Sequence, residues 1–518
     1  MYLPFPITVK GLALADQSKT IRLHSNDNVV VAKSVLQSGF VFENQDTTSA
    51  MVPAGHKIAT TALSVGQAII KYDQVIGFAT TDIKVGDHVH EHNMGYADFE
   101  RDYAFGTCRN DVKLVQEHEQ RTFQGFRRAN GVAGTRNYIG VISTVNCSAT
   151  VVKKIAENFT DEILSEYPNV DGVVALTHGS GCGMGTFEGQ LMVQRCVGGY
   201  ARHPNFAGVV IVGLGCEGLQ MKGLLQKEHL VVADTLRTLI IQDSGARAAL
   251  EQGIEAVKEM LPIAEKACRK AIPASELILA LECGGSDAYS GISANPGLGA
   301  AADLLIRQGG TACLAETPEI YGAEHLLTRR AVSQEVGEKL VARIKWWEEY
   351  TKRNNTTLNN NPAPGNKAGG LTTILEKSLG AVAKGGTTSL MDVYEYATPI
   401  TSKGFVFMDT PGYDPASVTG MIAGGANIAC FSTGRGSVYG SKPTPCLKLA
   451  TNSLMYNRMS EDMDVNCGVI IDGDASIDEL GEIIFEKILA TASGELSKSE
   501  LFGLGDLEFL PWAAGAVL

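Results

Sequence analysis

The sequence predicts an α/β protein whose larger part is a mostly parallel β-sheet with helices on both faces. From about residue 123 onward, continuous apolar runs alternate with segments of helical periodicity, which is typical of parallel sheets buried on both sides. The 57 glycines fit a fold with many tight turns between strands and helices. The 518 residues are enough for about three domains of roughly 100–200 residues each.

The first 97 residues differ from the rest and are predicted to form a separate β-rich domain. Short apolar runs at 28–32, 68–72 and 75–79 are separated by Gly, Asp and Asn, a pattern of short strands joined by turns. Residues 98–122 are polar and lack clear periodicity, so we expect a linker there.

The remaining chain is predicted to form two α/β domains, residues 123–272 and 273–518. In the first of these, the apolar runs predict strands at 138–143, 172–176 and 208–212, with a helix at 149–159. In the second, we expect helices near 298–308 and 333–352 and strands at 277–281, 311–315, 404–408 and 426–431. An Asn-rich segment with two prolines, 352–370, is predicted to be a long loop.

The charge of the chain excludes several classes of partner. With 44 basic and 57 acidic side chains, the formal net charge is −13, so the chain lacks the positive field that nucleic acid or an anionic membrane needs. An anionic substrate must then be bound locally, by backbone N–H groups, a few basic side chains or a metal. No stretch approaches the about 18 apolar residues of a membrane span. Residues 1–6 lack the features of a signal peptide, so we expect a cytoplasmic protein.

The 11 cysteines are expected to be free thiols, since the chain shows no export signal. Ligands of parallel sheets bind at the carboxyl ends of strands, and four cysteines follow predicted strands in turns of small residues: Cys147, Cys182, Cys216 and Cys283. A single cysteine more often fills core space, but four at equivalent positions indicate a site. The other cysteines are expected to be structural, with Cys467 undecided.

His178 and Cys182 form a His-x3-Cys pair that could ligate iron or zinc, although no second close pair completes a zinc site. The same glycine-rich turn resembles a dinucleotide-binding loop. Its third fingerprint position is Thr186 rather than glycine, and residues 201–206 offer no acidic contact to a ribose. We therefore expect no NAD.

Histidines of the N-terminal region are further candidates. His56 and Lys57 lie in a tight turn, where a His–Lys pair suits proton abstraction next to a carboxylate; an ordinary surface turn is equally compatible. His88, His90 and His92 alternate, so on a strand they would share one face and could bind metal or supply a base. For His90 and His92 we favour a solvated strand end.

Two glycine-rich loops are predicted to bind anions. Residues 361–370 and 432–437 contain small residues that let the backbone approach a ligand, and Lys367 and Arg435 add fixed charge. A carboxylate or a phosphate would suit either loop. The alternatives are an ordinary linker for the first loop and a helix cap for the second.

Eight short motifs, distributed over nearly the whole length, resemble those of one enzyme family. They are residues 55–57, 126–131, 134–137, 213–217, 283–287, 294–296, 364–370 and 432–436. With these motifs the chain is identified as a member of the altronate and galactarate dehydratase family. The resemblance implies an N-terminal β-clip (SAF-like) domain, a linker, a second domain for dimerisation and a Rossmann-like C-terminal domain with a parallel sheet. It also implies dependence on iron(II) and on reducing conditions.

The resemblance implies a hydro-lyase that converts a sugar acid to a 2-keto-3-deoxy acid, with D-altronate to 2-dehydro-3-deoxy-D-gluconate as the first expectation. Segments 69–72, 88–93 and 321–327 look more like altronate dehydratases. Segment 326–331 leans toward galactarate dehydratases, which form 5-dehydro-4-deoxy-D-glucarate. Two alternatives are a sulfo-lyase acting on a hydroxy sulfonate and a non-catalytic sugar-acid sensor. The sequence lacks a basic DNA-binding helix, which counts against the sensor.

Such a β-elimination needs a base for the proton α to the carboxylate, a metal or N–H groups for the enediolate, and an acid for the leaving hydroxyl. We expect catalysis from His56, Lys57 and His178. Substrate binding is expected from Ser286, Asp287, Asn366, Lys367, Thr433 and Arg435. The expected iron ligands are Cys147, Cys182, Cys216 and Cys283, with manganese(II) or an iron–sulfur cluster as alternatives. The expected partners are a small-molecule substrate and a second copy of the chain in a homodimer, without nucleic acid or membrane.

Overall fold

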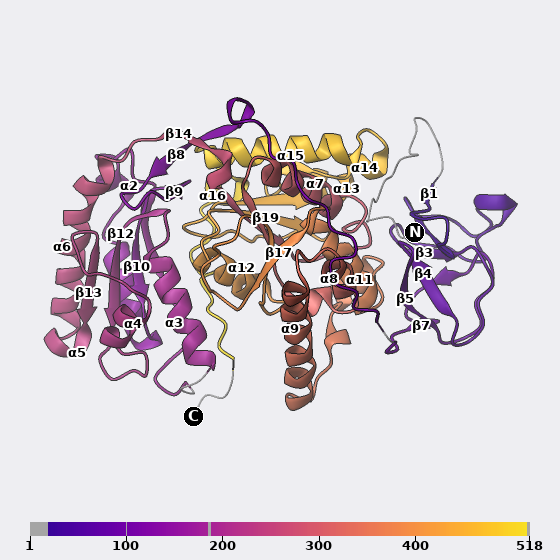
Figure 1. The fold of residues 1–518 in the computed structure, drawn as a ribbon, viewed down its shortest axis with the longest axis horizontal. Helices are drawn as coiled ribbons and strands as arrows, with labels where there is room; N and C mark the ends of the chain where they lie inside the picture. Colours follow the sequence, from indigo (N-terminus) through magenta and orange to yellow (C-terminus); the bar gives the residue numbers. More distant parts are fainter. Residues whose placement is uncertain (1–18, 100, 185–187, 515–518) are drawn as a thin grey trace.

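A computed structural model of the chain describes residues 19–99, 101–184 and 188–514. Three regions lie side by side along its longest axis: an N-terminal β-rich region, a large central α/β region and a smaller α/β region on the opposite side (Figure 1). Residues 1–6 and Thr186, on which the signal-peptide and dinucleotide predictions rest, lie outside the described residues. Within the described chain, no helix combines the length and the apolar character needed to cross a membrane.

The N-terminal region consists of short antiparallel strands, as its turn-rich sequence predicts. Its two sheets have the orders β1-β2-β3-β6 and β4-β5-β7, and the strands are β1 (Thr20–Ile21), β2 (Val29–Ala32), β3 (Lys57–Ala59), β4 (Ala68–Lys71), β5 (Gln74–Ala79), β6 (His88–Val89) and β7 (Met94–Gly95). Buried side chains of these strands, such as Ile69 and Ile76, belong to the same hydrophobic cluster as side chains of the central region. The two regions therefore share one core.

The segment that follows β7 runs along the surface of the central region (Figure 1). Its described residues contain the short 3₁₀ turn η2 (Glu117–Glu119). The backbone N–H groups of Cys108 and Val115 donate to the carbonyl oxygens of Arg329 and Arg307 at 2.8 and 2.9 Å. The predicted linker is thus attached along its length.

The second region is built on a parallel sheet with the order β11-β10-β12-β13. The strands are β10 (Tyr138–Ser143), β11 (Gly172–Leu176), β12 (Phe206–Gly213) and β13 (Leu236–Ile240). One face is covered by α1 (Ala149–Ala156) and α6 (Ala246–Glu265). The other face is covered by α3 (Glu188–Ala201) and α4 (Met221–Lys227). A small antiparallel sheet of β8 (Thr122–Arg127), β9 (Ala133–Gly134) and β14 (Lys270–Pro273) joins this region to the central one.

The central region contains a sheet of seven described strands, all parallel, with the order β17-β18-β16-β15-β19-β20-β21. These are β15 (Ile278–Cys283), β16 (Thr311–Leu314), β17 (Leu390–Tyr394), β18 (Gly404–Met408), β19 (Ile428–Thr433), β20 (Cys446–Ala450) and β21 (Val465–Asn466). The chain builds β16 to β18 on one side of β15 and then β19 to β21 on the other. The order therefore reverses between β15 and β19, the place where open α/β sheets bind ligands. The predicted α/β fold with a mostly parallel sheet is confirmed.

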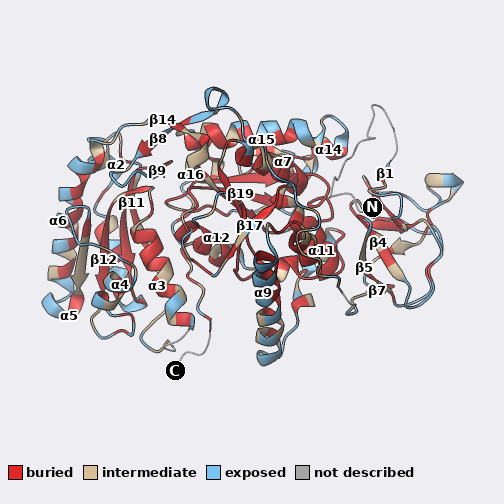
Figure 2. Cartoon of the chain, in the orientation of Figure 1, coloured by how far each residue is buried: buried red, intermediate tan, exposed pale blue. Residues whose placement is uncertain are grey.

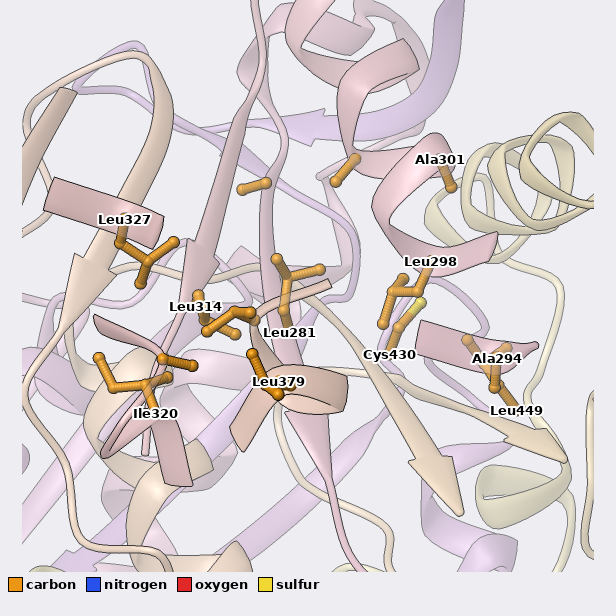
Figure 3. Close-up of a cluster of buried hydrophobic side chains, with 14 of the residues drawn as sticks. Leu281, Ala294, Leu298, Ala301, Leu314, Ile320, Leu327, Leu379, Cys430 and Leu449 are labelled. Atoms are coloured by element: carbon orange, nitrogen blue, oxygen red, sulfur yellow. The ribbon is translucent and has the colours of Figure 1, made fainter. Parts of the chain in front are cut away.

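Helices cover both faces of this sheet. Helices α7 (Ala294–Arg307) and α15 (Ile477–Ala492) pack on one face, where Leu281, Leu298 and Leu449 lie together in the core (Figure 3). Helix α12 (Asp414–Ala423) packs on the other face and against α3 of the second region. The strands are almost entirely buried, whereas α9 (Gln334–Arg353) projects with an exposed outer surface (Figure 2).

The sequence missed some elements. Strand β20 escaped because a buried Lys448 interrupts its apolar run, and β13, β17 and β21 were not predicted either. The predicted loop 352–370 contains a 3₁₀ turn, η6 (Leu358–Asn360), and the short helix α10 (Pro364–Ala368). That helix positions one wall of the site described next.

Candidate functional site

The candidate site lies at the carboxyl ends of β15 and β19. Cys283 ends β15 and Thr433 ends β19. The turns that follow are joined because the backbone N–H groups of Gly434 and Arg435 both donate to the carbonyl oxygen of Gly285, at 3.1 and 2.9 Å. The predicted substrate residues that follow these two strands therefore meet at the point where the strand order reverses.

Asp287 is the buried anchor of these turns. Its carboxylate accepts hydrogen bonds from the hydroxyl of Thr451 at 3.0 Å, the backbone N–H of Ser290 at 2.9 Å and the side-chain amide of Asn452 at 3.1 Å. Burial raises the pKa of Asp287, although these donors act against the shift. A Cβ added at Gly434 would overlap the carboxylate, so the turn requires glycine at that position.

Helix α10 closes one side of the site. The side-chain amide of Asn366 donates to the carbonyl oxygen of Ser286 at 2.8 Å, and its oxygen accepts from the backbone N–H of Ala363 at 2.8 Å. Lys367 is half-buried and forms an ion pair with Glu91 of the N-terminal region. Arg435 is exposed at the rim, and within the described chain its guanidinium has no ion-pair partner. Arg435 is therefore free to meet an anion.

Two lysines of the N-terminal region share one carboxylate of the central region. Lys57 donates to Glu376 at 2.8 Å and Lys71 donates to the other oxygen of the same carboxylate at 3.0 Å. Glu376 belongs to α11 (Ile374–Val382), and all three groups are buried. Burial alone would raise the pKa of Glu376, but the two ammonium groups lower it to about 2. Burial lowers the pKa of Lys57, so one carboxylate balances two amines of unequal basicity.

Histidines gather beside this ion pair. The Nδ1 atom of His56 lies 2.9 Å from the Nε2 atom of His88, and the ring of His90 stacks on that of His56 with centroids 4.7 Å apart. Burial lowers the pKa of His56 to about 4 and that of His88 to about 3, so both imidazoles are neutral at pH 7. His92 is exposed, as expected. His90 differs from the expectation because it is half-buried and contacts the carbonyl oxygen of Lys367 at 2.9 Å.

A buried network of charges surrounds Cys283. The Nζ atom of Lys384 lies 2.8 Å from the Cys283 sulfur and 3.2 Å from Glu316, and Lys377 pairs with Glu319 at 2.6 Å. Cys283, Glu316 and Glu319 lie close enough to hold a metal ion. However, burial raises the pKa of the Cys283 thiol well above its usual value, and the lysine ammonium groups already balance the carboxylates. The charges of this group are therefore already balanced without a cation.

A narrow cavity lies between the N-terminal and central regions. It is lined by groups of both regions, including Tyr72, Cys283, Ser286, Asn295, Glu376 and Lys377. The hydroxyl of Ser286 is buried and has no hydrogen-bond partner in the described chain. Since buried polar groups are normally paired, this hydroxyl is available to a ligand.

The site residues predicted from the sequence lie in two separate places in the structure. His56, Lys57, Cys283 and the six expected substrate residues lie together at this interface. Cys147, Cys182, Cys216 and His178 instead follow β10, β11 and β12 of the second region, on the opposite side of the central region (Figure 1). The four cysteines therefore cannot surround one ion, because Cys283 lies in a different region.

His178 has both ring nitrogens occupied. Its Nε2 atom lies 3.1 Å from the carbonyl oxygen of Ser143, and its Nδ1 atom accepts from the backbone N–H of Ser180 at 3.2 Å. Burial lowers its pKa to about 4. In this position the imidazole contacts two loops with its two nitrogens, and neither nitrogen is free for proton transfer.

Three family descriptions match successive parts of the chain. Residues 18–97 match the altronate/galactarate dehydratase SAF domain, and residues 125–265 match the D-galactarate dehydratase/altronate hydrolase second domain. Residues 274–517 match the D-galactarate/altronate dehydratase C-terminal domain.

The chain belongs to the altronate and galactarate dehydratase family.

Known relatives of this dehydratase align over most of its length. It is 35% identical to an altronate dehydratase of Bacillus subtilis, over 93% of this chain and 96% of that protein. It is 36% identical to a galactarate dehydratase (L-threo-forming) of Escherichia coli, over 92% and 93%. A (2R)-sulfolactate sulfo-lyase subunit beta of Chromohalobacter salexigens is 31% identical over 76% of this chain and 98% of that protein. The chain is thus a hydro-lyase of the sugar-acid dehydratase type.

Several charged residues of the candidate site were missed in the sequence. They are Lys71, Glu316, Glu319, Glu376, Lys377 and Lys384. A usable signal existed for two of them: Glu376 and Lys377 interrupt an otherwise small and apolar helical run, and charged residues are almost never fully buried unless paired. Their partners come from distant parts of the chain, so the pairing itself had no local signal.

Proposed function

We propose that this hydro-lyase converts D-altronate to 2-dehydro-3-deoxy-D-gluconate at the interface between the N-terminal and central regions. The observation that carries the proposal is the unpaired, buried Ser286 hydroxyl on the wall of this cavity, which also holds Lys377 and the Glu376 carboxylate that Lys57 and Lys71 share. Such a wall suits an anionic polyhydroxy acid. Identity does not separate altronate from galactarate, since both kinds of relative lie near 35%. The segment 88–93, which favours altronate, contributes the histidines beside the cavity.

The predicted substrate residues divide into two groups. Ser286 and Arg435 have free polar groups and are assigned to substrate hydroxyl and carboxylate oxygens. Asp287 and Asn366 already use their polar atoms on the protein, and the Thr433 hydroxyl accepts from a backbone N–H at 3.1 Å. We assign these three to positioning the turns. Lys367 lies at the rim of the site, where its ammonium group pairs with Glu91.

We assign Lys57 as the base that removes the proton from the carbon α to the substrate carboxylate. Glu376 can balance only one of its two lysines, so the other amine can lose its proton at little electrostatic cost. Lys57 is the candidate because burial lowers its pKa, whereas Tyr72 and Glu376 raise the pKa of Lys71 despite its burial. After proton transfer, the Lys57 and Lys71 ammonium groups stabilise the charge of the enediolate.

Iron(II) is proposed to bind His56, His88 and His90 rather than the cysteines. His56 and His90 each turn Nε2 toward a backbone carbonyl, of Ala368 at 3.4 Å and of Lys367 at 2.9 Å. An N–H donated there leaves Nδ1 as a free lone pair, the usual arrangement of metal-ligating histidines. The His56 and His88 nitrogens lie 2.9 Å apart. The three histidines are not among the described groups whose ligand atoms all lie within 4.8 Å of one another, so binding would draw the His90 ring toward the other two. When bound, the ion supplies Lewis-acid polarisation of substrate oxygens.

A substrate panel tests the reaction. Anaerobically purified protein with Fe²⁺ is given altronate, galactarate, glucarate, mannonate and sulfolactate, and 2-keto-3-deoxy acid or released sulfite is measured. We expect the highest kcat/KM with altronate. A higher value with galactarate would make this a galactarate dehydratase. Sulfite release would make it a sulfo-lyase, and binding without turnover would make it a sensor.

Two sets of variants test the assignments. Lys57→Met should lower kcat by about 100-fold or more, the usual contribution of a positioned base, whereas exposed Lys84→Met should not. Near-normal kcat in a folded Lys57→Met protein would overturn that role. His88→Ala and His90→Ala should each lose iron measured by metal analysis, whereas exposed His118→Ala should retain it. Full iron occupancy in both variants would place the metal elsewhere.

The proposed homodimer has its own test. The family description matched by residues 125–265 names a second domain, and we propose that this region carries the dimer contact. Sedimentation of the full chain should give about twice the mass of one chain. A monomer at assay concentration would refute it.

A further inference from the structure

Three cysteines of the second region have no part in the proposed function. Cys147, Cys182 and Cys216 are all exposed. They follow β10, β11 and β12, which are neighbours in the sheet with β10 in the middle. Because β10, β11 and β12 are parallel neighbours, the loops that carry the three thiols leave the sheet at the same edge.

The loops that carry these thiols are tied to one another. The backbone N–H of Asn146 donates to the carbonyl oxygen of Ser180 at 2.8 Å, and its side-chain amide donates to the carbonyl oxygen of His178 at 3.2 Å. The hydroxyl of Thr144 donates to Glu217 at 2.8 Å. Each of these bonds lies within a few residues of a cysteine on both loops that it joins, so the thiols are held near one another.

The surrounding groups suit bound sulfur. The side-chain amide of Gln242, on α5 (Ile241–Ser244), points to the Cys216 sulfur at 3.4 Å. N–H donors to sulfur are one of the means by which proteins stabilise and tune iron–sulfur centres. The carboxylate of Glu217 is turned away, since it accepts from the backbone N–H groups of Leu214 and Gly215 at 3.1 and 2.6 Å.

The distances between the three thiols favour an iron–sulfur cluster over a single metal ion. Thiolates on one tetrahedral ion with bonds of about 2.3 Å lie roughly 3.8 Å apart. Among the described residues, however, the groups whose ligand atoms all lie within 4.8 Å of one another do not include these three cysteines. A four-iron cubane holds its cysteines on separate iron atoms and therefore needs the wider spacing.

We propose that Cys147, Cys182 and Cys216 bind a [4Fe–4S] cluster at this edge of the second region. The cluster enters as a preformed [4Fe–4S]²⁺ unit. Each of the three cysteine thiols displaces one exchangeable thiolate ligand of that unit and gives its proton to the displaced thiolate, so three Fe–S bonds form, three break and no electron is transferred. The fourth iron keeps a ligand that is not a cysteine of this set. The site is separate from the cavity that holds Ser286, and it does not depend on the proposed dehydration.

The test counts sulfide, because histidine-bound iron brings none. The full chain is incubated anaerobically with a preformed, thiolate-ligated [4Fe–4S]²⁺ cluster and desalted, and iron, acid-labile sulfide and visible absorption are measured. We expect about four sulfides per chain, and a loss of at least 80% in the triple variant Cys147→Ser/Cys182→Ser/Cys216→Ser. Cys268→Ser, which removes another exposed thiol, and His88→Ala should keep the full sulfide content. Equal sulfide in the triple variant and the wild type would overturn the proposal.

Thiol protection gives a second measurement that does not depend on a variant folding. Reconstituted wild-type protein is treated with an alkylating agent, and modified peptides are identified by mass spectrometry. Cys147, Cys182 and Cys216 should react at least tenfold more slowly than Cys268, and removal of the cluster should abolish that difference. Reaction of all four thiols at similar rates in the reconstituted protein would refute cluster binding.

Discussion

Replacing Glu376 by glutamine should strongly destabilise the folded protein. The change keeps the size of the side chain but removes the carboxylate that faces both Lys57 and Lys71 at hydrogen-bond distance. The Lys71 ammonium would then be buried without a counter-charge. Removing one partner of a buried ion pair typically costs about 3–5 kcal/mol.

The titration of Glu376 gives a second value for the same effect. Its pKa falls from 4.5 to about 2 because the two lysines outweigh the effect of burial. A shift of about 2.5 units corresponds to roughly 3.4 kcal/mol at about 1.36 kcal/mol per unit. Since the folded pKa is the lower one, this stability is present above pH 4.5 and is lost as the pH falls from 4.5 toward 2. The two values agree in size.

Urea unfolding followed by fluorescence measures the change. Glu376→Gln should lower the free energy of unfolding at pH 7 by about 3 kcal/mol. Glu395→Gln, which breaks a more exposed pair with Arg195, should lower it by less than about 1 kcal/mol. Between pH 4.5 and 2 the difference between wild type and Glu376→Gln should shrink. A loss below about 1 kcal/mol, or a difference independent of pH, would refute this account of the ion pair.

Three further outcomes are expected. Ser286→Ala should raise KM by about tenfold, the loss of roughly one hydrogen bond, while leaving urea unfolding unchanged because the hydroxyl has no protein partner; an unchanged KM would contradict its role. Gly434→Ala should lower the melting temperature and kcat together, because its Cβ would displace Asp287; wild-type values would show that the turn can adapt. Burial lowers the pKa of His203 to about 4, so wild-type stability should fall by up to about 3 kcal/mol as the pH drops from 6.5 to 4. His203→Gln should reduce the slope in urea unfolding across this range by that amount, while His56, His88 and His178 keep their own contributions; a slope equal to that of the wild type would contradict the role of His203.

Much of the fold was predictable because burial leaves a local pattern. Strands β10, β12, β15 and β19 are apolar throughout, and their runs predicted both the strands and the parallel sheet. Strand β20 was not predictable in the same way, because Lys448 is buried within it. A lysine in a short apolar run looks like a surface residue until the whole fold is known.

The candidate site was only partly predictable for a related reason. The motifs around Ser286 and Arg435 follow strands, so their meeting at the sheet edge could be inferred. The docking of Lys57 on Glu376 joins positions 319 residues apart, and nothing local specifies such a contact. The grouping of Cys283 with the other three cysteines was wrong because two different parallel sheets carry these strand ends.

Residues 101–121 lie along the central region and connect the two halves of the site covalently. The lysines of the N-terminal region reach Glu376, and its histidines reach α10, through noncovalent contacts, so the segment supplies mainly a high effective concentration of one half for the other. A single cut in it would leave two pieces held by the shared core and the buried ion pair. The sulfolactate sulfo-lyase relatives, whose names specify separate alpha and beta subunits, show that an arrangement in two chains occurs among similar proteins. In this dehydratase the covalent connection makes assembly of the site independent of protein concentration.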